Sequence, residues 1–193
     1  CENNMLTDIL SGIPFSPIQP FHEGLERRPE SLQSSVSLTY LGTAGFVFSG
    51  SNRTLVVDPY VSRPSLNQHA FTKLQSDEQL VQKWIPSADD VLVGHAHHDH
   101  ILDAPCVCHQ TGARLIGSED VIRVGRATGL PEAQLLSTQG RENITCGDGN
   151  LVRGIPSAHG KVYFNRIPLQ GNIPETFKWP ANYWQFRHGH VLN

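Results

Sequence analysis

The most informative part of the sequence is Val91-Leu92-Val93-Gly94-His95-Ala96-His97-His98-Asp99-His100. The three apolar residues at its start predict a short buried strand, and a histidine-rich loop follows at once. Imidazole and carboxylate groups are ligands for zinc, iron or manganese. Because His95 and His97 alternate at the extended end of a strand, their side chains should point the same way. Asp99 and His100 come after the chain turns, so one loop can serve two metal ions.

Two residues elsewhere are candidates for the same site. His159 follows a predicted strand at 152–156 in a context of small residues, and beside the cluster we expect it to be the third nitrogen ligand of the first metal. Asp58 ends the apolar strand 54–57. A buried carboxylate needs partners, so hydrogen bonds that hold the histidine loop are its expected role. His98 stands at the variable position of the cluster, and we expect it to have no direct role.

The rest of the sequence alternates strands with helices. Strands are predicted at 35–41, 46–48, 54–57, 91–93 and 114–116, helices between Ser76 and Pro86, at 102–110 and from Ser118, and a hairpin at 143–156. This order predicts an α/β fold with a mixed sheet. Residues 1–35, which contain four prolines, are expected to be an irregular arm, and residues 36–193 the domain.

The composition excludes several classes of protein. The 193 residues, 38% hydrophobic and 17% charged, are typical of one globular domain. The chain has fifteen Lys and Arg and eighteen Asp and Glu, and its basic residues form no cluster, so no nucleic-acid partner is expected. No apolar stretch approaches the roughly 20 residues that span a bilayer. The four cysteines form no C-x-x-C motif, which favours reduced thiols and a cytoplasmic location; a lipid anchor on Cys1 is the alternative.

The quoted residues resemble a known family. Asp58 at a strand end, the element His95-x-His97-x-Asp99-His100 and the later His159 are similar to the first three motifs of the metallo-β-lactamase superfamily. The resemblance covers about residues 36–160. Residues 42–45 and 55–59 are most similar to the broad metal-dependent hydrolase branch, which includes the L-ascorbate-6-phosphate lactonase and N-acylphosphatidylethanolamine phospholipase D types.

The resemblance implies both a fold and a chemistry. The fold is an αββα sandwich with a metal pair at the sheet edge. His95, His97 and His159 would hold the first metal, and Asp99 and His100 would help to hold the second. Two divalent ions, most simply zinc, with iron or manganese as alternatives, would supply a metal-bound hydroxide. That hydroxide, oriented by Asp99, would cleave an ester, lactone, amide or phosphodiester bond in a small-molecule or lipid-like substrate.

The sequence departs from the family in its second half. The family has a bridging aspartate and a last histidine there, but no aspartate follows His159 in this chain. Three explanations are open: the chain is a fragment, which we prefer; the protein is naturally short and binds one metal; or His188 and His190 supply substitute ligands. An incomplete sandwich exposes an apolar sheet face, so we expect the remaining half of the fold or an oligomer partner to cover it.

Other functions are also open. The same ligands suit iron, so an iron-dependent oxygenase or redox member of the fold is one alternative. A non-enzymatic, degenerate binding module is the other. The proline-containing segment 165–182, with aromatic residues in or beside it, is interpreted either as a lid over the site or as packing for the second sheet.

Overall fold

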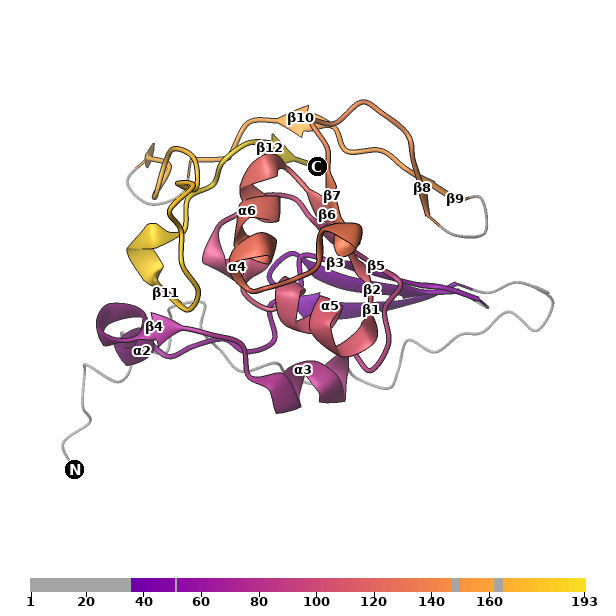
Figure 1. Cartoon of the computed structure of the whole chain (residues 1–193), viewed down its shortest axis with the longest axis horizontal. Coiled ribbons are helices and arrows are strands. Elements are labelled where there is room, and N and C mark those ends of the chain that lie inside the picture. Colours follow the sequence, from indigo (N-terminus) through magenta and orange to yellow (C-terminus); the bar gives the residue numbers. More distant parts are fainter. Residues whose placement is uncertain (1–35, 51, 147–149, 162–164) are drawn as a thin grey trace.

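A six-stranded sheet in the order β1-β2-β3-β5-β6-β7 organises the chain (Figure 1). The computed structural model describes residues 36–50, 52–146, 150–161 and 165–193, so the expected N-terminal arm lies outside the described residues. The strands are β1 Ser37–Gly42, β2 Gly45–Ser49, β3 Thr54–Val57, β5 Asp90–Val93, β6 Arg114–Gly117 and β7 Leu135–Ser137. The first three form an antiparallel meander, and β3, β5, β6 and β7 run parallel. The predicted mixed sheet and α/β class are confirmed.

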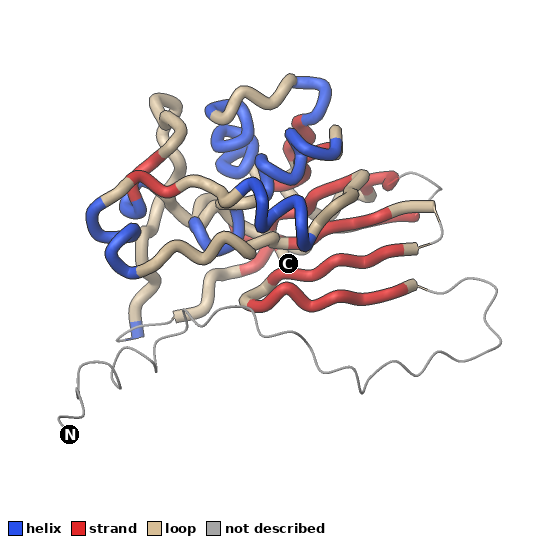
Figure 2. The backbone as a smooth tube through the Cα atoms, turned by 90° about the horizontal axis from the view of Figure 1, so that it is seen from below, coloured by secondary structure: helices blue, strands red, loops and turns tan. Residues whose placement is uncertain are grey.

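The helices gather on one side of this sheet (Figure 2). They are α2 Leu66–Phe71, α3 Glu78–Trp84, α4 His98–Ile101, α5 Ala104–Thr111 and α6 Glu119–Ala127, with short 3₁₀ turns at Glu132–Gln134 and Tyr183–Gln185. Helix α5 packs on β5 and β6, and α6 packs on β6 and β7. The sequence did not predict α2 or α4, because each is shorter than the stretch over which helical periodicity can be recognised.

The start of α3 differs from the predicted one by a residue. Asp77, not Ser76, is the N-cap, because its carboxylate accepts hydrogen bonds from the N–H groups of Gln79 and Leu80 at 3.1 and 3.0 Å. The hydroxyl of Ser76 instead donates to the carbonyl of Leu102 at 2.8 Å. This bond connects the start of α3 to the segment between α4 and α5.

Alternate side chains of the sheet enter two different cores. Val56, Val91 and Leu115 are fully buried in the principal core on the helical side. Their neighbours, such as Leu92 and Ile116, point to the other face, as the twofold repeat of a strand requires. There the hairpin β8 Ile144–Cys146 and β9 Asn150–Val152 covers part of the sheet. The hairpin was predicted, although its turn at 147–149 lies outside the described residues.

A cavity of about 260 Å³ lies on this second face. Its lining includes Val57, Leu92, Val152 and Leu192, and it reaches Asp58 and Gly94 at the strand ends. The second face is therefore only partly filled by the described residues.

Two short strand pairs attach the late part of the chain to the rest. Strand β11 Ala181–Asn182 pairs with β4 Lys73–Leu74, and β12 Val191–Leu192 pairs with β10 Pro156–Ser157. Figure 1 shows β10 and β12 side by side. Within and just after the segment 165–182, Ile173, Phe177 and Phe186 are buried in the principal core. These side chains pack on the helical side, which corrects the second-sheet interpretation. The lid interpretation stays a prediction.

Among the described residues, none of the helices combines the length and the apolar character that crossing a membrane requires. Cys106, Cys108 and Cys146 are free thiols in the structure. Burial raises the pKa of Cys146 to about 11, so this thiol is protonated and unreactive near neutral pH.

Candidate metal centre

The histidine cluster lies at the carboxyl end of β5, the edge where parallel α/β sheets place their ligands. The structure corrects the prediction that a single loop carries it. Only residues 94–97 are loop, and His97 is the N-cap of helix α4, which holds Asp99 and His100 on its single turn. The helical turn separates the side chains of His97 and His98, so that they enter different surroundings.

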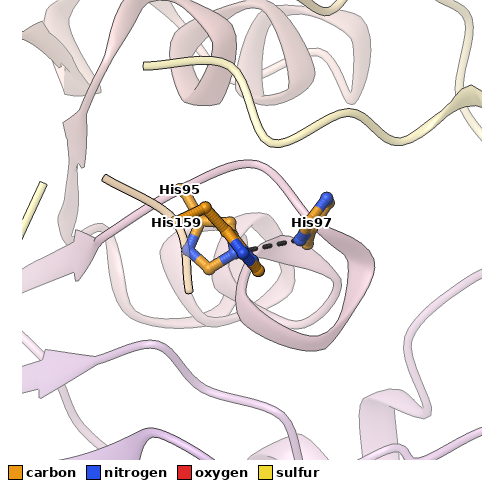
Figure 3. Close-up of side chains that lie close together, drawn as sticks. All are labelled: His95, His97 and His159. Carbon is orange, nitrogen blue, oxygen red and sulfur yellow. Dashed lines mark hydrogen bonds between the residues drawn. The ribbon is translucent and has the colours of Figure 1, made fainter. Parts of the chain in front are cut away.

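Three imidazoles converge at this edge (Figure 3). One ligand atom from each of His95, His97 and His159 lies within 4.8 Å of the other two. The Nε2 of His95 is 3.1 Å from the Nδ1 of His97, and the three ring centroids are 4.8 to 4.9 Å apart. His159 reaches the cluster from the loop after β10. The structure thus brings together the three histidines that the resemblance assigned to the first metal.

Burial keeps two of these imidazoles neutral. His95 and His97 are 7% and 5% exposed. Burial, reinforced by the neighbouring imidazoles, lowers the pKa of His95 to about 2, and burial lowers that of His97 to about 4. Within the described part of the chain, the buried Nε2 of His97 has no hydrogen-bond partner. Neutral imidazoles with available lone pairs are the form that binds metal, so the residues present fit a divalent cation.

Asp58 and His100 form a second group beside the triad. The Oδ1 of Asp58 accepts a hydrogen bond from the N–H of Gly94 at 2.7 Å, and its Oδ2 is 3.0 Å from the Nδ1 of His100. Burial disfavours protonation of His100, but the contact with Asp58 outweighs it, so the pKa of His100 is raised. The ring centroids of His100 and His95 are 3.9 Å apart, and the Nε2 of His100 is 4.0 Å from the Oδ2 of Asp99. The half-buried Asp99 completes the group.

His98 lies in a separate buried cluster of rings. Its ring centroid is 4.8 Å from those of His69 and Tyr183 and 5.7 Å from that of Tyr60. Burial lowers the pKa of His98 to about 4. Sequence reasoning did not find this cluster, because its members come from α2, the loop after β3 and the late segment, which no spacing rule connects.

Asp103 is a second residue that sequence reasoning missed. It is completely buried, and burial raises its pKa. Its Oδ2 accepts hydrogen bonds from the N–H groups of Val61 and Ser62 at 2.6 and 2.8 Å, and its Oδ1 accepts one from the Ser62 hydroxyl at 2.5 Å. An aspartate directly before the Ala104 helix start was the available signal, since such residues are typical N-caps. Here the side chain instead ties the loop after Asp58 to the start of α5.

The two late histidines have different surroundings. The ring centroid of His188 is 5.8 Å from that of His97 and 6.0 Å from that of His159. His190 is exposed, and its Nε2 is 3.0 Å from the carbonyl oxygen of Gln139. Of this pair, His188 lies beside the triad.

Neutral imidazoles and carboxylates at the carboxyl edge of a mixed sheet define a metal-binding α/β protein. The family follows from a comparison with family models, because the one described as a beta-lactamase superfamily domain matches residues 37–179. The chain belongs to this superfamily, as the motifs around the histidine cluster predicted.

Several relatives and solved structures are similar to the chain. A UPF0173 metal-dependent hydrolase of Anaeromyxobacter dehalogenans is 31% identical over 139 residues, which cover 70% of this chain and 47% of that protein. A second such protein, from Pyrobaculum islandicum, is 28% identical over 114 residues, 59% of this chain and 46% of that protein. The chain thus spans about half the length of these relatives. A metallo hydrolase from Ignicoccus hospitalis matches with 22% identity and a TM-score of 0.48, over 70% of this chain and 53% of that one.

Proposed function

We propose that the chain carries the metal centre of a metal-dependent hydrolase that cleaves an ester, lactone, amide or phosphodiester bond. The convergence of three imidazoles, two of them buried and neutral, is the observation that carries the proposal. The relatives named metal-dependent hydrolases support it. A small or lipid-like molecule is the proposed substrate.

The proposed ligands form two groups. His95, His97 and His159 hold the first ion, and Asp99 and His100 contribute to a second. Zinc is the simplest choice, because imidazole and carboxylate are its usual ligands in hydrolases. The bound ions supply a Lewis acid that lowers the pKa of a coordinated water toward about 7.

The chain's own residues orient the site and move protons. Asp58 holds the start of the histidine loop through the Gly94 N–H, and it fixes His100 through their 3.0 Å contact. The partly exposed carboxylate of Asp99 accepts the proton of the attacking water and passes it to solvent. Burial of His95 and His97 keeps their lone pairs available at neutral pH.

The test compares His97→Ala with a matched control. His109→Ala removes an exposed histidine of α5 whose Nε2 is 3.1 Å from the carbonyl oxygen of Thr128. Protein purified without added metal is analysed for its metal content and assayed on a lactone, an aryl ester, a phosphodiester and a β-lactam. We expect metal and turnover to disappear together in His97→Ala and to persist in His109→Ala.

Three results would contradict the proposal. Unchanged turnover in His97→Ala would exclude the triad as the catalytic centre. Iron with a visible absorption spectrum and no hydrolysis would favour an oxygenase or redox protein. Folded protein that binds no metal and cleaves nothing would favour a binding module.

A further inference from the structure

The segment 188–192 runs directly beside the histidine loop. The N–H of Ala96 donates a hydrogen bond to the carbonyl of His188 at 3.1 Å, and the N–H of Leu192 donates to the carbonyl of Gly94 at 2.8 Å. Ala96 stands between His95 and His97. The backbone of His188 is therefore fixed opposite the centre of the His-x-His element.

The same segment is also fixed to the strand that leads to His159. In the pairing of β12 with β10, Val191 is opposite Ser157. Ser157 is two residues before His159. One short segment thus contacts both parts of the chain that supply the triad.

The His188 side chain faces the triad at short range. Its ring centroid is 5.8 Å from that of His97 and 6.0 Å from that of His159, whereas the ring centroids within the triad are 4.8 to 4.9 Å apart. The Nδ1 of His188 is 2.6 Å from the carbonyl oxygen of Gly189. When this nitrogen carries the proton it donates to that carbonyl, and Nε2 keeps its lone pair.

The turn that presents His188 is built specifically. Gly189 has a φ of +64°, and a Cβ at this position would lie 2.4 Å from the carboxylate of Asp120. The buried Asp120 accepts hydrogen bonds from the N–H groups of Ile173 at 2.6 Å and His190 at 3.2 Å. The N–H of His188 donates to the carbonyl of Leu169 at 3.2 Å. These contacts on both sides hold the His188 backbone in one place.

We propose that His188 is a fourth imidazole ligand of the metal held by His95, His97 and His159. Its ring centroid lies about 1 Å farther from those of His97 and His159 than the triad centroids lie from one another, so His188 would join the ion by a small movement of its ring. Zinc accepts four protein ligands in structural sites, and catalytic zinc sites can expand to five-coordinate. The inference rests on the proposed metal centre but does not require hydrolysis. His188 then raises the affinity of the site for the ion.

A cobalt titration of the 193-residue chain tests the assignment. Cobalt(II) is added to metal-free protein and followed by its visible absorption, for the wild type, His188→Ala and His190→Ala. We expect His188→Ala to raise the Kd about 10-fold or more and to change the absorption band. His190→Ala, which removes an exposed ring two residues away, should match the wild type. Equal Kd and equal spectra for all three proteins would overturn the assignment.

Two further variants separate the possible failures. His188→Phe fills the same space without a ligand atom. It should therefore weaken cobalt binding as His188→Ala does. It also keeps the test valid if the alanine variant folds poorly. His97→Ala should abolish binding. If His97→Ala binds cobalt normally, the proposed metal centre itself is wrong. If only the His188 variants bind normally, the triad stands and the fourth ligand is wrong. A wild type that binds no cobalt would overturn both.

Discussion

At the scale of single residues, burial determines the chemistry of the centre. An exposed histidine is half protonated near pH 6.5, and a proton on the ligating nitrogen blocks metal binding. In this chain burial lowers the pKa of both His95 and His97. The contact with Asp58 has the opposite effect on His100. Neighbouring imidazoles therefore differ in protonation because their partners differ.

His98 gives a prediction at this scale. Its pKa is lowered from 6.5 to about 4 in the folded protein, so the unfolded chain binds its proton first. The stability that this pKa shift contributes is fully present above about pH 6.5 and is lost as the pH falls toward 4. His98→Phe keeps a ring against Tyr60 and removes the titration. We expect the loss of stability between pH 7 and 5 to be about 2 kcal/mol smaller in this variant.

The measurement is denaturant unfolding at both pH values in the presence of a chelator. His109→Phe, which changes an exposed histidine, serves as the control and should lose as much stability as the wild type. An equal loss in His98→Phe and the wild type would contradict the assignment of this pH dependence to His98.

At the scale of elements, the site depends on how loops and helix starts are tied together. Asp58 connects the end of β3 to the loop after β5, and Asp103 connects the loop after β3 to the start of α5. Asp58 thus holds the start of the histidine loop and Asp103 holds the start of α5, each by accepting backbone N–H bonds.

Asp103→Ala should destabilise the fold by about 2 to 4 kcal/mol, because the buried N–H of Val61 and the half-buried N–H of Ser62 lose their acceptor. Glu119→Ala is the matched control, since Glu119 is also an acidic residue at a helix start but is exposed. Glu119→Ala should change the free energy of unfolding by no more than about 0.5 kcal/mol. Denaturant unfolding at pH 7 measures both variants, and equal midpoints would show that the Asp103 hydrogen bonds are not structurally important.

The sequence predicted the parts that follow from local patterns. Apolar runs located β3, β5 and β6, and the spacing of His95 and His97 indicated a shared direction for their side chains. It did not predict α4, whose single turn is too short for periodicity. It also could not place His188 or the buried Phe186, because their contacts depend on how β4, β11, β10 and β12 pair over long distances in the chain.

At the scale of the whole molecule, the sheet has one face that is only partly filled. Leu92, Leu136 and Val152 are half-buried there, beside the 260 Å³ cavity. We propose, as the incomplete sandwich predicted, that the remaining half of the fold or an oligomer partner covers this face.

Dye binding tests this proposal. The isolated 193-residue chain should enhance ANS fluorescence or associate with itself in sedimentation, and Leu136→Gln should reduce either effect. Leu151→Gln, on the exposed side of the hairpin, is the control and should change neither. A wild-type chain that is monomeric and binds no dye would show that the face is already closed.

In the proposed metal centre, His95, His97 and His159 bind one divalent ion. X-ray absorption at the zinc edge of the zinc-loaded chain tests this binding. We predict a shell of imidazole nitrogens at about 2.0 Å that disappears in His97→Ala. A sulfur shell at about 2.3 Å, or an unchanged spectrum in His97→Ala, would contradict the account.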